Sequence, residues 1–590
     1  MAATTAAQNR MPMLLRSTGM FHTVLLLCRS DTVCHLLLRM RIYYQKETRL
    51  SMEKCDAPAI RATRGIINPF IKTFFMRSCC MISVLCIPDY SERLGPMKCP
   101  RVLLAVFLGV CGACSSQPGP IIGTTGGSLD DNLSLLKLFD TPSEDTIHFY
   151  TVAYNILASN PRASFFELSR YPEFAAFCRD HGITLTGGPM LGSRTADGVK
   201  IWVRTSAPAE VSVKVTTPDK ERMFGPVTTD AASDLTGIID VTGLPPDSRC
   251  PYSVLVNGTP AKISPHAEII TLPESDAAKP VRIAFGSCYH RWGLANPVLA
   301  GRIRERNPAA LLLMGDIAVQ DRKNHLGLHR ADYLLRDLHP AWRDLVAAVP
   351  VYAAWDDHDY FSNDEAGIPA GFTADDRWGV RQVFTQSWNN PAYGFSDDRG
   401  GIFFHTQIGP CDVIMTDNRY FRTGKKGVFL GEDQMQWLEA RLLECRGPFI
   451  ILSCGTMWSD YVSNGKDSWG RMDPEGRERL FRFIEQHRIG GVLLISGDRH
   501  GARGFRIPRP GGFSFYEFGA ASLGARNGPP VTDPSWETQL YGFESVYAFG
   551  EFTIDATPED PTVTFRLIRE DGAELYTKTL TRGELTPPGT

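Results

Sequence analysis

The pattern of apolar and polar positions changes twice after the first 130 residues. Over residues 132–180, apolar residues recur in pieces at helical spacing, which predicts short helices. Over residues 183–274, apolar and polar residues alternate, as in Val199-Lys200-Ile201-Trp202-Val203, and turn residues separate the runs. Short alternating strands at regular spacing predict a small β-sandwich of the immunoglobulin or fibronectin type.

From residue 281 onward, the pattern becomes that of an α/β fold. Short, almost wholly apolar runs alternate with amphipathic stretches, which predicts buried strands separated by helices. The predicted strands cover residues 281–285, 310–314, 349–354, 413–416, 449–452 and 492–495. The clearest helical stretches cover residues 330–346, 432–444 and 476–487.

Each of these predicted strands ends in polar residues. The carboxyl ends of strands in an open α/β sheet form one rim, so side chains from distant parts of the chain should meet there. These side chains are Cys288, Asp316, Asp357, His358, Asp417, Asp498 and His500. A single Asp after a strand is more often a helix cap, but several carboxylates on one rim repel each other unless cations lie between them. Carboxylates favour hard ions such as Ca²⁺, whereas Cys and His favour softer or redox metals, so the rim predicts two metals of mixed type.

The order of these motifs resembles that of the PhoD-like alkaline phosphatases over about residues 187–507. The motifs that carry the resemblance are Phe285-Gly286-Ser287-Cys288, Gly315-Asp316, Trp355-Asp356-Asp357-His358-Asp359 and Gly497-Asp498-Arg499-His500. The resemblance implies a calcineurin-like metallophosphoesterase core, in which two packed sheets are flanked by helices, preceded by the β-sandwich. It also implies a metal-dependent phosphohydrolase that cleaves phosphate monoesters, diesters or both by attack of a metal-activated hydroxide.

The resemblance assigns roles to individual residues. It implies that Asp316 bridges the metals and that the other ligands are Cys288, Asp357, Asp498 and His500. It places His358 beside the leaving group. Arg419 is a candidate phosphate clamp, because a guanidinium matches phosphate oxygens, and a structural ion pair with Asp417 is the alternative.

One position departs from the family pattern. The family usually has a Tyr three residues after the Asp of its Gly-Asp motif, where the phenolate binds ferric iron, and this chain has Val319 there. We therefore expect two or more metal ions that include Ca²⁺ or another divalent cation, with iron in doubt.

The N-terminal part differs from the rest in charge. Residues 1–96 hold 13 of the 62 Lys and Arg residues but 6 of the 65 Asp and Glu residues, and they read as an extension foreign to the mature protein. Residues 97–113 have the basic start, apolar run and small residues of a lipoprotein signal peptide, which predicts export and membrane attachment through a lipidated Cys114. A buried apolar helix is the alternative. The whole chain has a net charge of −3, which argues against nucleic acid as its main partner.

The predicted domains follow from these boundaries. Residues 114–182 form a tether and helical segment, 183–274 the β-sandwich, 281–555 the metallophosphatase domain and 556–590 a C-terminal strand and tail. Two other functions stay open. The chain could be a catalytically degraded PhoD-like envelope lipoprotein that acts as a binding or scaffold protein, or the sandwich could be a surface-adhesion module, which exposed aromatic residues on it would favour.

Overall fold

The computed structural model describes residues 83–87, 103–107, 127–274, 279–395, 397, 399–424, 427–461, 468–524 and 528–589. The chain divides into two compact units, Met1–Pro118 and Gly119–Thr590. In the first unit, β1 (Ser83–Ile87) and β2 (Leu103–Phe107) form an antiparallel pair. Apart from β2, the predicted signal peptide lies outside the described residues, as does Cys114. Within the described part of the chain, the search for a helix long and apolar enough to cross a bilayer finds none.

The second unit begins with the predicted helical segment. Its helices are α2 (Leu129–Leu136), α3 (Glu144–Ser159), α4 (Phe165–Ser169) and α5 (Pro172–Asp180). Ser128, Ser143 and Ser164 cap the first three of these helices by accepting backbone hydrogen bonds, which explains where each helix starts. The buried faces of these helices share one apolar cluster with residues of α7 (Leu326–Leu338).

Residues 183–274 form two antiparallel sheets. One contains β3 (Leu185–Gly192), β4 (Val199–Thr205) and β7 (Thr236–Val241). The other contains β5 (Ala209–Thr216), β6 (Glu221–Thr229), β8 (Arg249–Val256), β9 (Thr259–Pro260) and β10 (Glu268–Ile270). Alternate residues of both sheets, including Ile201, Val213 and Val254, belong to one buried cluster, as the alternating pattern predicted. The finer assignment to an immunoglobulin or fibronectin type stays a prediction.

The remaining strands form two larger sheets. The six-stranded sheet has the order β13-β12-β11-β21-β22-β23, with β11 (Val281–Gly286), β12 (Ala310–Met314), β13 (Val351–Ala354), β21 (Ala548–Asp555), β22 (Thr562–Arg569) and β23 (Glu574–Thr581). The seven-stranded sheet has the order β14-β15-β16-β17-β19-β18-β20, with β14 (Phe404–Ile408), β15 (Cys411–Met415), β16 (Phe449–Cys454), β17 (Val492–Ser496), β18 (Ala502–Pro508), β19 (Ser514–Gly519) and β20 (Gln539–Phe543). The segment predicted as a C-terminal strand and tail therefore supplies two strands, β22 and β23.

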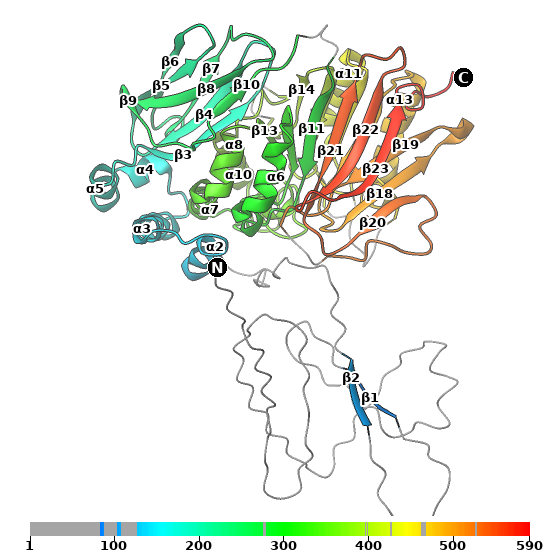
Figure 1. Ribbon diagram of the computed structural model, residues 1–590, viewed down its shortest axis with the longest axis horizontal. Coiled ribbons are helices and arrows are strands. Elements are labelled where there is room, and N and C mark those ends of the chain that lie inside the picture. Colours follow the sequence, from blue (N-terminus) through cyan, green and yellow to red (C-terminus); the bar gives the residue numbers. More distant parts are fainter. Residues whose placement is uncertain are drawn as a thin grey trace, which may run out of the picture. The chain divides into compact units, whose positions relative to one another are not determined.

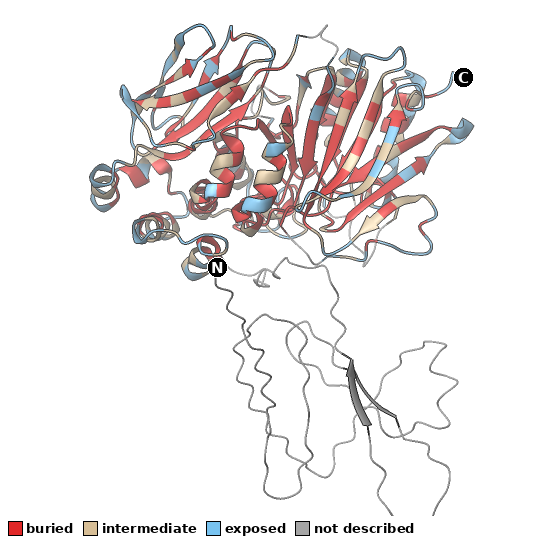
Figure 2. Ribbon diagram, in the orientation of Figure 1, coloured by how far each residue is buried: buried red, intermediate tan, exposed pale blue. Residues whose placement is uncertain are grey.

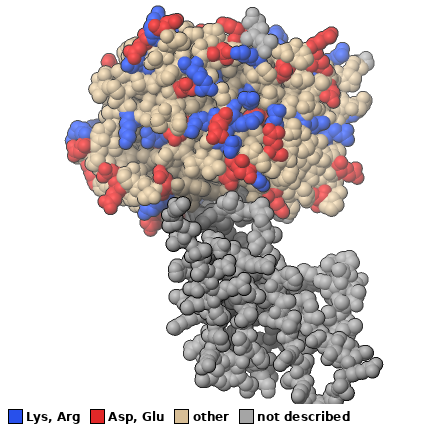
Figure 3. All heavy atoms as spheres, in the orientation of Figure 1, with Lys and Arg blue, Asp and Glu red and all other residues tan. Residues whose placement is uncertain are grey.

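The two larger sheets pack through a common core. Ile283 and Leu312 of the first sheet lie in the same buried cluster as Val413 and Ile451 of the second. Figure 1 shows the sheets and the helices on their outer sides, and Figure 2 shows β11 and β21 buried along most of their length. Positive and negative side chains are interspersed on the face drawn in Figure 3.

Helices cover the sheets, and one helix that the apolar pattern predicted as continuous is divided in two. The covering helices are α6 (Pro297–Glu305), α8 (Pro340–Val346), α9 (Asp357–Tyr360), α10 (Ala374–Ser387), α11 (Gly431–Glu444), α12 (Trp469–Met472) and α13 (Pro474–Gln486). The helix predicted over residues 330–346 is two helices, α7 and α8, that meet at His339 and Pro340. Proline has no N–H to donate and clashes with the preceding helical turn, so it begins a new helix here.

A buried polar network joins α2 to the loops that follow β11 and β12. Asn132 of α2 accepts a hydrogen bond from Arg291 Nη1 at 2.7 Å and donates one to the Tyr150 hydroxyl at 2.7 Å. Asp332 of α7 accepts two bonds of 2.7 Å from Arg322. The side chains of Asn132 and Asp332 are wholly buried, so this network is part of the interior.

Candidate metal centre

The predicted site residues come from loops at the carboxyl ends of five strands. Cys288 follows β11, Asp316 follows β12, Asp357 and His358 follow β13, Arg419 follows β15, and Asp498 and His500 follow β17. The structure therefore brings all seven residues to one rim. Their backbones are unusual, because φ is positive at Cys288, Asp316, Asp498 and His500, with values of 58°, 56°, 66° and 54°. Such conformations are unfavourable for residues with a side chain, and they cluster at functional sites.

The first group of donor atoms combines a thiol, two imidazoles and a carboxylate. The Cys288 Sγ donates to Asp316 Oδ2 at 3.7 Å, and His290 Nε2 lies 3.8 Å from the same oxygen. His290 Nε2 also lies 2.9 Å from His500 Nε2. One ligand atom from each of these four residues lies within 4.8 Å of all the others, so they can share one ion.

Charges at this group suit a cation. Burial raises the pKa of Cys288 well above its usual range, and nearby Asp316 adds to that effect. Burial, together with His500 and His358, holds the pKa of His290 well below its usual range, so this ring is neutral and has a lone pair for a metal. Without a cation, the site therefore keeps a protonated Cys288 thiol beside the neutral imidazole of His290.

The second group consists of the carboxylates of Asp316, Asp356 and Asp498. Asp316 Oδ1 and Asp356 Oδ2 are buried and have no hydrogen-bond partner among the described residues, which normally costs free energy. Burial raises the pKa of Asp356 to about 8, although Arg419 opposes that shift. Both groups contain Asp316, whose pKa burial also raises. The donor set and the two unsatisfied oxygens fit two cations that share Asp316.

His358 lies beside these groups and contacts a second carboxylate. Its Nδ1 lies 2.8 Å from Asp321 Oδ1 and 2.8 Å from Gln320 Nε2. Burial lowers the pKa of His358, but Asp316 and the hydrogen bond with Asp321 outweigh burial and raise the pKa to about 11. The ring is therefore protonated at neutral pH and can supply a proton.

Asp357 and Arg419 are placed differently from the other predicted residues. Asp357 Oδ2 accepts the backbone N–H of Asp364 at 2.6 Å, and Asp357 still lies within ligand range of Asp316 and His358. Arg419 is 1% exposed, and its guanidinium pairs with Asp356. Asp417 instead accepts a bond of 2.9 Å from the Arg419 backbone N–H, so the ion pair expected between Arg419 and Asp417 forms with Asp356. The clamp role of Arg419 stays a prediction.

Two residues of the site were missed in the sequence. His290 stands two residues after Cys288, and Asp356 immediately precedes Asp357. The Cys-x-His spacing after a strand was the available signal for His290, whereas the sequence of adjacent aspartates cannot indicate which one faces the rim. The side chain of Val319 lies in the main core, and its backbone N–H donates to Asp359 Oδ1 at 3.2 Å. Position 319 therefore offers no phenolate to the described site. His290 instead belongs to the donor group that contains Cys288, Asp316 and His500.

Comparison with known proteins supports the interpretation of this rim. Residues 313–565 match the family described as PhoD-like phosphatase, and residues 183–274 match a domain of unknown function (DUF7800). Alkaline phosphatase D of Bacillus subtilis (strain 168) is 24% identical over 232 residues, which are 34% of this chain and 37% of that protein. The chain thus matches little more than a third of the length of this curated relative.

Two solved structures share the fold. One, titled "Structure of PhoD", has a TM-score of 0.55 and 17% identity, and the match covers 68% of this chain and 89% of that one. Purple acid phosphatase PPD1 from yellow lupin (Lupinus luteus) seeds has a TM-score of 0.51 and 13% identity, with coverage of 67% and 74%. These similarities indicate a metallophosphoesterase-like fold. Together with the family match, they confirm the resemblance seen in the sequence: residues 313–565 form a domain that matches the PhoD-like phosphatases.

Proposed function

We propose that this protein is a metal-dependent phosphohydrolase that cleaves phosphate monoesters, diesters or both. The observation that carries the proposal is the sharing of Asp316 between a Cys–His–His group and a group of two further aspartates, with a protonated His358 alongside. The residues that would hold the metals are Cys288, His290, Asp316, Asp356, Asp498 and His500, with Asp357 at the margin of the site. When bound, divalent cations there supply acidification of water and neutralisation of phosphoryl oxygens.

The chain's own groups provide the remaining chemistry. His358 would donate a proton to the leaving oxygen, because its pKa of about 11 keeps the ring charged at neutral pH. Asp321 holds that ring through a bond of 2.8 Å to Nδ1, so Asp321 acts as a positioning residue. Arg419 balances the charge of Asp356 inside the rim. We infer Ca²⁺ as one of the metals because carboxylates dominate the second group.

The test combines metal analysis with hydrolysis of model esters by the full chain. Asp316→Ala should lose bound metal and activity together, because both donor groups contain this carboxylate. His358→Ala should keep most of the metal and lose about 10²–10⁴-fold in rate, which is the usual range for a positioned general acid. The loss should be smaller for aryl esters, whose leaving groups need less protonation.

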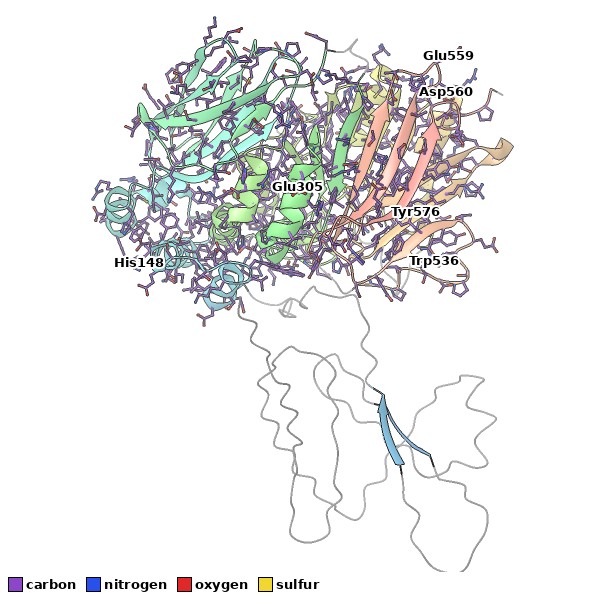
Figure 4. The ribbon with its side chains drawn as sticks, viewed as in Figure 1. His148, Glu305, Trp536, Glu559, Asp560 and Tyr576 are labelled. Carbon is purple, nitrogen blue, oxygen red and sulfur yellow. The ribbon has the colours of Figure 1, made fainter. Side chains whose placement is uncertain are left out.

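A matched control is available in His148, an exposed histidine on α3 that Figure 4 labels and that belongs to none of the metal-ligating groups among the described residues. His148→Ala should change neither metal content nor rate. Equal losses on aryl and alkyl esters in His358→Ala would contradict the general-acid role, and loss of metal in that variant would make His358 a ligand. Full activity in Asp316→Ala would contradict the role of Asp316 as the shared ligand. Failure of the metal-loaded, unsubstituted protein to hydrolyse any of the model esters would overturn the phosphohydrolase proposal itself.

The location is a separate proposal. We propose that the protein is exported and attached to a membrane through a lipid on Cys114, because residues 97–113 have the layout of a lipoprotein signal peptide. Mass spectrometry of the native protein should then find a lipid-modified N-terminus at Cys114 and no peptide from residues 1–96. Recovery of those peptides from cells would contradict this.

The alternative functions receive less support. A degraded scaffold would not need two buried carboxylate oxygens aimed at a shared site, and the metal-ligating groups are present. For the adhesion module, the described residues of 183–274 expose Met223 and Ile238 as large apolar side chains and expose no large aromatic one. The feature that would favour adhesion is therefore missing from the described sandwich.

A further inference from the structure

A second cluster of metal-ligating side chains lies at the opposite end of the seven-stranded sheet. His405 is on the edge strand β14, Asp412 is near the start of β15, and Cys445 follows the last residue of α11. The catalytic rim lies beyond the other end of β15, where Asp417 follows the strand. Asp417 is five residue steps along the chain from Asp412, so the two places are about 17 Å apart at ~3.3 Å per residue. Figure 1 shows β14 and α11 at the same end of the molecule.

The three side chains converge on a single ring nitrogen. Asp412 Oδ1 lies 2.8 Å from His405 Nε2, and Cys445 Sγ lies 3.9 Å from the same nitrogen. A nucleophilic relay needs the thiol and the carboxylate on opposite nitrogens of the imidazole. Two donors that meet at one nitrogen are instead arranged as ligands around a common point. All three donor atoms lie within 4.8 Å of one another.

The spacing is close to that of a tetrahedral ion. Bond lengths of about 2.0–2.1 Å for N and O and about 2.3 Å for S imply N–O and N–S separations of ~3.3 and ~3.6 Å. The observed separations of 2.8 and 3.9 Å therefore need to change by about half an ångström or less. The thiolate and the carboxylate would together balance the charge of a divalent ion.

The surroundings hold the carboxylate in place for this role. Asp412 Oδ2 accepts backbone N–H groups of Arg446 at 2.9 Å and Gly447 at 2.7 Å, which leaves Oδ1 facing the histidine. Outer hydrogen bonds of this kind orient the ligands in metal sites. The nearby cations are engaged elsewhere, since Arg441 pairs with Glu444 and the Arg446 guanidinium donates to the Leu443 carbonyl at 3.1 Å.

We propose that His405, Asp412 and Cys445 form a second metal site, separate from the catalytic rim, that binds Zn²⁺ with solvent as its fourth ligand. A set of one imidazole, one carboxylate and one thiolate suits Zn²⁺ better than a hard ion such as Ca²⁺ or Mg²⁺. The His405 side chain is 22% exposed, so an ion can enter from solution. Bound there, the ion would join the edge strand β14 to β15 and to the end of α11.

The test measures Zn²⁺ bound per chain by equilibrium dialysis of the full-length protein after chelation. Cys445→Ser and His405→Gln should each bind one Zn²⁺ fewer than the unsubstituted protein and keep its phosphatase rate. Loss of a direct ligand should weaken this Zn²⁺ more than ~100-fold, because loss of an outer hydrogen-bond partner already costs ~10–100-fold. Cys178→Ser removes a buried thiol of α5 and serves as the matched control, with unchanged Zn²⁺ binding.

Cobalt separates this site from the catalytic thiol. In a Cys288→Ser background, the Co²⁺-loaded protein should keep a thiolate–cobalt absorption band in the near ultraviolet, and adding Cys445→Ser should remove it. The proposal is overturned if Cys445→Ser binds as much Zn²⁺ as the unsubstituted protein, if the cobalt band survives both substitutions, or if native Cys445 is recovered in a disulfide. If Cys445→Ser does not fold, two other measurements test the site: the loss of one bound Zn²⁺ in His405→Gln and a Zn²⁺-dependent rise in Tm of the unsubstituted protein. Absence of both effects would refute the site.

Discussion

Asp359 holds the loop that carries Asp316, the proposed shared metal ligand, and its removal should destabilise that loop strongly. Its Oδ1 accepts the backbone N–H groups of Ile317, Ala318 and Val319 at 3.1, 3.2 and 3.2 Å. These three residues are at most 1% exposed, so water cannot easily replace the carboxylate. Each buried donor left without a partner costs about 1–3 kcal/mol. Asp359→Ala should therefore lower the free energy of unfolding by about 3–9 kcal/mol, a large part of the ~5–15 kcal/mol typical of a domain.

The same loop begins at Asp316, so the substitution should also affect metal binding. Loss of a positioning contact typically weakens a metal site by about 10–100-fold, and we expect Asp359→Ala to do so. Asp359→Asn is the matched variant, because its amide oxygen can still accept these bonds. It should cost about 1–2 kcal/mol, since only the added strength of a charged acceptor is lost.

Urea unfolding and metal titration of the three proteins test this reasoning. The midpoints should fall in the order of unsubstituted protein, Asn variant and Ala variant. Unfolding of the Ala variant at the same urea concentration as the unsubstituted protein would show that these hydrogen bonds do not stabilise the loop. An Asn variant as unstable as the Ala variant would show that charge, and not hydrogen bonding, holds the loop.

Three further predictions concern charge and the missing phenol. Burial lowers the pKa of His339 to about 4, so the native ring stays neutral while the unfolded ring is protonated below its ordinary pKa of about 6.5. The contribution of His339 to the free energy of unfolding should be complete above pH ~6.5 and fall by about 3 kcal/mol toward pH ~4. In urea unfolding at pH 7 and pH 5, His339→Gln should therefore lose less stability between the two pH values than the unsubstituted protein. Arg419→Gln should cost about 3–5 kcal/mol in metal-free protein because Asp356 loses its buried partner; unchanged stability with a raised KM would support a phosphate clamp instead. Iron-loaded protein should show no iron–phenolate band, and Val319→Tyr should create one while overpacking the core by about 1–3 kcal/mol, as absorption and thermal unfolding would reveal.

The sequence predicted strands and strand ends better than it predicted which neighbouring side chain faces the site. Buried parallel strands are apolar throughout, so β12 was predicted with its observed bounds of Ala310–Met314. The break at Pro340 was missed because the apolar spacing continues across it. Orientation was harder, since Asp356 and Asp357 are adjacent and only the backbone after β13 determines which carboxylate enters the group with Asp498.

Contacts between distant segments were the least predictable. His405 and Cys445 lie forty residues apart in the sequence, and neither follows a predicted strand end. Val319 was recognised as a departure from the family, but the presence of His290 in the site was not predicted, because its contact with His500 spans 210 residues. Such contacts depend on strand order and loop geometry, which local patterns do not encode.

The buried link between Asn132 and Arg291 bears on how this protein divides into modules. The family match begins at residue 313, after both Cys288 and His290, so a fragment cut at that boundary would lack two metal-ligating residues. A fragment cut at residue 281 would still leave Arg291 without the Asn132 oxygen that it contacts at 2.7 Å. Arg291 would keep its ion pair with Asp332 at 3.5 Å, so the cost is that of one hydrogen bond to a charged group, about 1.5–3 kcal/mol. The helices before the sandwich should therefore stabilise the loops of the candidate metal centre, and insertions or truncations should be tolerated better at the sandwich turns than at this junction.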